Sequence, residues 1–318
     1  MTTPQHPDDA LVLYGETFAS RLMLGTSRYP SPATLEAAVK REQPGMLTDS
    51  LRRHGAAQPE AGAAFWKLLQ ELAVPVLPNT AGCHTTQEVI TTAQMAREVF
   101  NTPWIKLELI GDDYSLQPDT LNLVDCARQL ISDGFKVLPY CTEDLVLCQR
   151  LVDVGCQAVM PWAAPIGTGQ GPVNPYAMRL LRERLSVPLI VDAGLGLPSH
   201  ACTVMEWGFD GVLLNTAVAL AQSPVDMAGA FADAVRAGQL DASHWPDEPA
   251  DYGIAPHPRE HAFAPCPEIG LYAVMPNADW TIRMARAGVP TVQLRFKSDD
   301  AAAIEREVRA AVLAVQGT

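Results

Sequence analysis

Short apolar runs rich in β-branched residues recur along the first two thirds of the chain, at intervals of roughly 20 to 35 residues. Stretches with the periodicity of amphipathic helices separate them. This alternation is typical of a parallel α/β protein, in which a covering helix follows each strand. The predicted strands are Arg21–Gly25, Gly45–Thr48, Val74–Leu77, Trp104–Ile110, Phe135–Tyr140, Ala158–Pro161, Pro188–Asp192 and Gly211–Leu214.

Eight strand-helix units favour a closed barrel over an open sheet. Thr85–Phe100 and Pro198–Trp207 are two of the helices predicted between the strands. A barrel of this kind takes about 250 residues, so the 318-residue chain has room for one barrel and a short additional segment. We therefore predict the α/β class and a (β/α)8 TIM barrel over residues 11–238, after a disordered start over residues 1–10.

The chain changes character after Gly238. Residues 239–267 are rich in Pro, His, Asp and Ala without a sustained period, which is typical of a linker. Strand and helix patterns then alternate over Ile269–Val274, Asp279–Ala287, Thr291–Phe296 and Ala301–Gln316. Two such units cannot close a barrel or cover both faces of their strands. We predict a short incomplete βαβα extension over residues 268–318 that packs on something else or remains loosely ordered.

Composition narrows the classes of function. Hydrophobic residues make up 48% of the chain and the mean hydropathy is +0.04, which indicates a soluble globular protein with a large core. No stretch approaches the roughly 20 apolar residues of a membrane span, and a signal peptide is not evident, so we expect a cytoplasmic protein without membrane association. The net charge of −13 argues against nucleic acid as a partner. The seven cysteines contain no C-x-x-C pair and the histidines no clear metal-ligand spacing.

The segment WIKLELIGDD, residues 104–113, is the most informative one. The strand period of two places Lys106 and Glu108 on one face and aliphatic residues on the other. If the aliphatic face meets the helices, both charged residues point into the barrel, where burial is costly. Burial favours the neutral lysine amine, which attacks a ketone to form an imine, while nearby carboxylates oppose that shift and can move protons. A buried ion pair without a catalytic role is the alternative.

The seventh predicted strand ends in Asp192, which glycines follow, so a carboxylate and flexible backbone lie at the barrel mouth. We interpret Asp192 as a second acid or base, with a helix cap as its alternative role. The loops Pro165–Gly171 and Leu214–Ala217 are candidates for a phosphate cradle, although such loops are more often plain turns. The run LPNTAGCHT, residues 77–85, shows no partner set for a nucleophile, so we interpret Cys83 as structural.

Several ordered motifs together resemble bacterial thiazole synthase. They are NTAGC at 79–83, WIKLE at 104–108, LPY at 138–140, MP at 160–161, PIGTGQGPVNP at 165–175, VDAGLG at 191–196 and GVLLNTA at 211–217. The likeness extends from about Leu11 to Gly238. It departs from the family in the second strand, which reads GMLTDSLRRHG where the family more often has an apolar, threonine-rich run.

The resemblance implies that Lys106 forms an imine with 1-deoxy-D-xylulose 5-phosphate, and that Glu108 and Asp192 act as acid and base groups. The residues that it implies in contact with the sugar phosphate are Gly167, Ala193, Gly194, Asn215 and Thr216. Sulfur would enter from the thiocarboxylate terminus of a small sulfur-carrier protein, and dehydroglycine from a separate enzyme would close the ring. The resemblance further implies a homo-oligomer and no metal or organic cofactor on this chain.

The tail resembles the start of thiamine phosphate synthase, on the runs IGLYAVMPNADW and AGVPTVQLRFK. The residues that match its pyrimidine-binding strand are Gln293, Leu294, Arg295 and Lys297. The later strands and metal-binding aspartates of that enzyme are absent, so we expect no thiamine phosphate formation. Two alternatives stay open for the chain. One is an aldolase-like imine enzyme acting on another sugar phosphate, without a sulfur carrier; the other is a non-catalytic fusion remnant that only binds partners.

Overall fold

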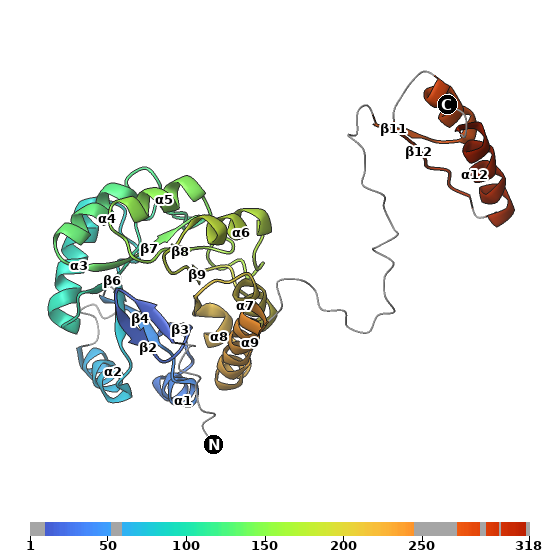
Figure 1. The fold of residues 1–318 in the computed structure, drawn as a ribbon. Coiled ribbons are helices and arrows are strands. Elements are labelled where there is room, and N and C mark those ends of the chain that lie inside the picture. The colour runs from blue at the N-terminus through green and yellow to red at the C-terminus, as the bar shows by residue number, and fades with distance from the viewer. Residues whose placement is uncertain (1–9, 52–58, 245–271, 287–290, 299, 316–318) are drawn as a thin grey trace. The chain divides into compact units, whose positions relative to one another are not determined.

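The computed structural model describes residues 10–51, 59–244, 272–286, 291–298 and 300–315 (Figure 1). The chain divides into two compact units, residues 1–247 and 248–318, which are described separately. All but the last residue of the expected disordered start over residues 1–10, and most of the expected linker over residues 239–267, lie outside the described residues. Helix α9 (Pro224–His244) continues past the point at which we expected the linker to begin.

A parallel sheet of eight strands forms the centre of the first unit (Figure 1). Its strands are β3 (Leu22–Gly25), β4 (Met46–Ser50), β5 (Val76–Asn79), β6 (Trp104–Leu107), β7 (Lys136–Cys141), β8 (Met160–Pro161), β9 (Ile190–Asp192) and β10 (Gly211–Leu214). Their order in space is β8-β7-β6-β5-β4-β3-β10-β9, and a parallel bridge from Val159 to Leu189 joins the two ends of that series. The sheet therefore closes on itself, and the predicted (β/α)8 barrel is confirmed.

Helices surround the barrel and cover the outer face of its strands (Figure 1). They are α1 (Pro32–Glu42), α2 (Pro59–Leu72), α3 (Thr86–Phe100), α4 (Leu123–Ser132), α5 (Leu145–Asp153), α6 (Pro175–Arg184), α7 (Pro198–Glu206), the short α8 (Thr216–Ala219) and α9. Their starts follow local capping chemistry: Thr85 and Glu88 form a capping box at α3, and the Asp144 side chain accepts from Leu147 N at α5. Apolar faces of these helices bury against the strands as one continuous core.

A small antiparallel hairpin, β1 (Leu11–Leu13) and β2 (Glu16–Phe18), precedes the barrel, and the sequence analysis did not predict it. Tyr14 and Gly15 form its turn with φ angles of 49° and 75°, which matches the type I′ turns that join short hairpins. The buried hairpin residues pack into the barrel interior beside Trp104, the first residue of β6. The apolar side chains that the strands contribute to this interior cluster are Met23, Met46, Leu77, Trp104, Leu138, Met160, Ile190 and Leu213. The hairpin thus closes the amino-terminal end of the barrel.

The second unit contains the strand-helix-strand-helix order predicted for the extension. Its elements are β11 (Tyr272–Met275), α11 (Ala278–Arg286), β12 (Thr291–Leu294) and α12 (Ala301–Val315). The two strands pair in parallel from Tyr272 and Thr291 onward, as strands joined by a crossover helix do. Helix α11 packs against both strands and against α12. Whether this unit is related to thiamine phosphate synthase stays a prediction.

Candidate active site

A cavity of about 530 Å³ opens among the loops at the carboxyl ends of the barrel strands. All the predicted site residues line it, although they come from four strands and the loops that follow them. They are Lys106, Glu108, Gly167, Asp192, Ala193, Gly194, Asn215 and Thr216. The structure therefore brings the predicted residues into one place. Their chemical roles stay predictions at this point.

Lys106 forms the floor of the cavity with two carboxylates. Its Nζ lies 2.5 Å from Asp192 Oδ2 and 3.0 Å from Glu108 Oε1, and all three side chains are buried. Ile105 and Leu107, which alternate with the lysine and the glutamate along the strand, belong to the outer core against the helices. Because successive side chains of a strand point to opposite faces, Lys106 and Glu108 point inward. The inward orientation predicted from the strand period is thus confirmed.

The charges of this cluster set its resting protonation. Burial by itself lowers the pKa of Lys106, but the adjacent charges of Asp192 and Glu108 outweigh burial and raise that pKa above its ordinary value. Of the two opposing effects that the sequence anticipated, the carboxylates prevail, so the resting lysine is charged. Burial raises the pKa of Asp192 more than the charge of Lys106 lowers it. Asp192 is therefore a better proton acceptor than an exposed aspartate, and a proton from Lys106 can pass to it across the 2.5 Å contact.

Tyr140, from the LPY motif on β7, packs behind the lysine. The Lys106 Nζ lies 5.8 Å from the centroid of its ring, and its hydroxyl donates to the carbonyl oxygen of Leu116 at 3.5 Å. Burial, together with the charges of Asp192 and Glu108, raises the pKa of Tyr140, so the phenol stays neutral. The ring thus fixes the lysine against an apolar surface that excludes water from this side.

The opposite end of the cavity is lined mainly by backbone. Ala193 and Gly194 both adopt left-handed φ angles, 76° and 80°, immediately after Asp192. A side chain at position 194 would place its Cβ 2.3 Å from the backbone nitrogen of Ala164, so only glycine fits. The left-handed conformation of Ala193 costs about 1–2 kcal/mol for a residue with a Cβ. Strain of this kind is typical of functional sites, and both residues line the cavity.

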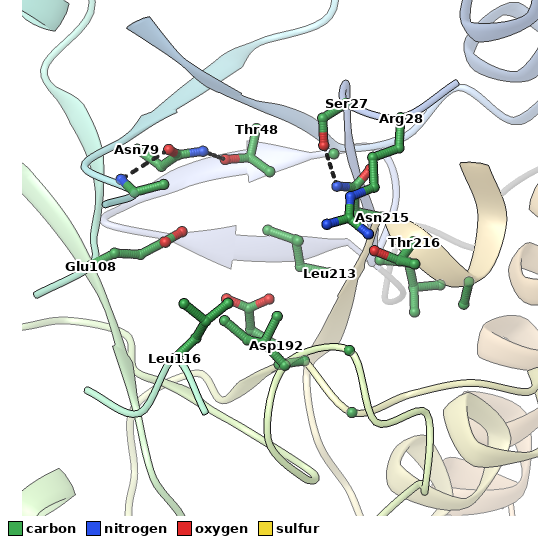
Figure 2. Close-up of a pocket in the computed structure, with 18 of the residues that line it drawn as sticks. Ser27, Arg28, Thr48, Asn79, Glu108, Leu116, Asp192, Leu213, Asn215 and Thr216 are labelled. Carbon is green, nitrogen blue, oxygen red and sulfur yellow. Dashed lines mark hydrogen bonds between the residues drawn. The ribbon is translucent and has the colours of Figure 1, made fainter. Parts of the chain in front are cut away.

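Asn215, at the end of β10, is fixed by its neighbours on β3 and the following loop. Its Nδ2 donates to Ser27 Oγ, and a Cβ on Gly25 would lie 2.7 Å from the Asn215 Cβ. Figure 2 shows Ser27, Asn215 and Thr216 together at one end of the cavity. The Asn215 Oδ1 is buried and has no hydrogen-bond partner among the described residues, so it is an acceptor that a bound molecule can use.

Sequence reasoning assigned no role to several other residues of the cavity: Ser27, Arg28, Thr48, Ser50 and Asn79. Asn79 Nδ2 donates to Thr48 Oγ1 at 3.0 Å, so these two side chains form a polar wall that Figure 2 shows near Glu108. The signal for Thr48 and Ser50 is the strand period of two, because inward positions at a carboxyl strand end face the mouth. No comparable local signal marks Arg28.

No group of three or more His, Cys, Asp and Glu side chains is arranged to hold a metal ion within the described part of the chain. Cys83 is buried in the outer core and does not line the cavity. Among the helices that the structure describes, none has the length and apolar character needed to cross a membrane.

Comparisons with known proteins agree on one family. The family model described as thiazole biosynthesis protein ThiG matches residues 12–256. A thiazole synthase of Paracidovorax citrulli is 80% identical over 232 residues, which is 73% of this chain and 86% of the relative. A thiazole synthase of Cupriavidus taiwanensis is 68% identical over 266 residues, 83% of this chain and 92% of the relative. A solved structure of the BexX/CysO complex from Amycolatopsis orientalis is similar with a TM-score of 0.67 and 27% identity, over 75% of this chain and 97% of that one.

Proposed function

The chain belongs to the ThiG family of thiazole synthases, which are enzymes of thiamine biosynthesis. From this premise we propose that it builds the thiazole phosphate through an imine on Lys106. The observation that carries the proposal is the position of the lysine. Lys106 Nζ lies within 3.0 Å of two buried carboxylates on the floor of an open cavity. A primary amine beside proton acceptors is what imine formation with a ketone requires.

In the proposed first step, Lys106 passes a proton to Asp192 and its neutral amine attacks C2 of 1-deoxy-D-xylulose 5-phosphate. The carbinolamine that forms then loses its hydroxyl as water, with the proton returned by Asp192, and the C2=N imine results. The cavity backbone at Gly167, Ala193 and Gly194, with Asn215 and Thr216, would bind the phosphate end of the sugar. This supports an orientation in which C2 lies over the lysine and the phosphate near β9 and β10.

Glu108 then removes the proton from C3, and reprotonation at C2 leaves an amine at C2 and a ketone at C3. The thiocarboxylate sulfur of a carrier protein attacks that C3 carbonyl, the carrier's acyl group passes from sulfur to the C3 oxygen, and loss of the carrier as its carboxylate leaves a thioketone at C3. The nitrogen of dehydroglycine then displaces the Lys106 amine at C2, the sulfur adds to the imine carbon of dehydroglycine, and loss of water completes the ring. The solved relative BexX is in complex with a second protein, CysO, which supports a protein partner for this chain. We also propose that a separate enzyme supplies the dehydroglycine, that the protein is a homo-oligomer, and that it is located in the cytoplasm.

The test is reconstitution from purified components: the full chain, 1-deoxy-D-xylulose 5-phosphate, dehydroglycine and a thiocarboxylated carrier protein. We expect thiazole phosphate by mass spectrometry, and none when the carrier carries an ordinary carboxylate. Smaller sugar fragments without any need for the carrier would favour the aldolase-like alternative. No reaction of any ketose phosphate with Lys106 would favour the non-catalytic alternative.

A further inference from the structure

Arg28 is a cation of the cavity without an assigned role. Of the described residues that line the cavity, Lys106 and Arg28 are the basic ones and Glu108 and Asp192 the acidic ones. Lys106 is already paired with both carboxylates, so it has no unpaired positive charge to offer a phosphate. The chain as a whole has a net charge of −13. A separate cation in this cavity would therefore add to the binding of a phosphate dianion that backbone N–H groups provide.

The fold places Arg28 at the end of the cavity lined by Asn215 and Thr216. Strand β3 pairs in parallel with β10, Leu24 opposite Leu214, and both strands end at the cavity. Ser27, the residue before Arg28, accepts a hydrogen bond from Asn215 Nδ2. Figure 2 shows the Arg28 side chain directed to this end, whereas Glu108 lies at the other end of the view.

The conformation of Arg28 also needs an explanation. Its φ is 70°, in the left-handed region that residues with a Cβ rarely adopt. The residue is exposed, and no hydrogen bond or ion pair joins its guanidinium to another residue in the described part of the chain. Arg28 thus occupies a strained loop position from which an unpaired cation faces the cavity. A guanidinium group can donate two parallel hydrogen bonds to the oxygens of one phosphate.

We propose that Arg28 binds the phosphate of the ketose substrate and makes the enzyme selective for phosphorylated over unphosphorylated ketoses. This assignment rests on the proposed function only for the identity of the ketose. Arg28 does not touch the reacting carbon, so it affects substrate binding and not the chemistry at C2. Lysine can supply the charge but not the paired hydrogen bonds, so Arg28→Lys should be intermediate between the wild type and Arg28→Gln.

The first experiment titrates the full-length protein with inorganic phosphate by phosphorus NMR. Arg28→Gln should weaken phosphate binding about tenfold or more, because a charged hydrogen bond to an anion is lost. Arg128→Gln is the matched control, since it removes an exposed arginine that pairs with Asp125 on the outer helix α4. Unchanged phosphate affinity in Arg28→Gln, or an equal loss in Arg128→Gln, would overturn the proposal.

The second experiment measures imine formation, trapped by borohydride, at increasing concentrations of 1-deoxy-D-xylulose 5-phosphate and of 1-deoxy-D-xylulose. Arg28→Gln should raise the half-saturating concentration about tenfold or more for the phosphorylated sugar and leave that of the unphosphorylated sugar unchanged. An equal loss for both sugars indicates a merely structural role and overturns the selectivity. If the wild-type protein forms no imine, the proposed function fails, and the phosphate titration still decides the role of Arg28.

Discussion

At the residue scale, one lysine lies beside two carboxylates on the cavity floor. This arrangement gives Lys106 a different protonation state from that of a lysine that is merely buried. A lysine alone in an apolar pocket would lose its proton, whereas Lys106 keeps it because Asp192 and Glu108 raise its pKa. The site must then remove that proton before the amine can attack a carbonyl. Asp192, whose pKa burial raises, is the acceptor in closest contact.

Asp192→Asn should shift the pH dependence of imine formation. The substitution removes the charge that most raises the pKa of Lys106, so that pKa falls and the rising limb of the rate moves to lower pH. Loss of the proton acceptor also slows the maximal rate about 10²-fold or more. The measurement is the rate of borohydride-trapped imine at a series of pH values.

Glu108→Gln provides the matched comparison. It should retain sugar binding and slow imine formation to a similar extent. The rising limb of the rate should also move to lower pH, but by less than in Asp192→Asn, because Glu108 raises the pKa of Lys106 less than Asp192 does. A limb that stays in place in both variants would remove the two carboxylates from control of the lysine. Unchanged single-turnover rates would remove them from the mechanism.

At the element scale, the strand ends and the loops that follow them determine which side chains face the cavity. The strand period of two was sufficient to predict that Lys106 and Glu108 face inward, because strands of a barrel alternate strictly between the interior and the helices. It could not predict the protonation of the lysine, which depends on the contact between β6 and β9. Nor could it identify Arg28, whose place follows from the pairing of β3 with β10.

Gly194→Ala should destabilise the protein more than Gly134→Ala. Both glycines have φ near 80°, at 80° and 82°, so both substitutions introduce the left-handed penalty of about 1–2 kcal/mol. A Cβ at 194 also meets the Ala164 backbone at 2.3 Å, whereas nothing lies within 4 Å of one at 134. The clash should add about 1–3 kcal/mol. The check is the free energy of unfolding in urea, and equal losses would refute the close packing of the two loops.

Leu13→Ala should destabilise the barrel by about 2–5 kcal/mol, because the hairpin closes the interior with a fully buried leucine. Val12→Ala on the same strand is the control, since Val12 is 48% exposed and should cost well under half as much. Chemical denaturation compares the two. Similar small losses would mean that the hairpin contributes little. The sequence analysis missed this hairpin because its strands have only three residues each.

At the scale of the whole molecule, the site lies within the first unit. Every residue that lines the cavity precedes residue 218, and the family match ends at residue 256. The strand-helix alternation predicted this unit well, because eight similar apolar runs each correspond to one barrel strand. The start of the linker was less predictable, since Gln239, Leu240 and Ala242, which favour helices, lie in the segment that continues helix α9 to His244.

A chain shortened to residues 1–256 should form the imine at the rate of the full chain, because it keeps every residue that lines the cavity. Single-turnover trapping with both chains at equal concentration tests this. A large loss in the shortened chain would assign the second unit a part in the site. Formation of thiamine phosphate by the full chain would contradict our expectation that this unit has no coupling activity.

The central claim is that Lys106 forms the imine, and peptide mass spectrometry tests it most directly. The full-length protein is incubated with 1-deoxy-D-xylulose 5-phosphate, reduced with borohydride and digested, beside Lys106→Ala and the exposed control Lys67→Ala. We predict an adduct with the mass of the reduced sugar phosphate on Lys106, lost in Lys106→Ala and kept in Lys67→Ala. An adduct that persists in Lys106→Ala, or no adduct in the wild type, would contradict the account.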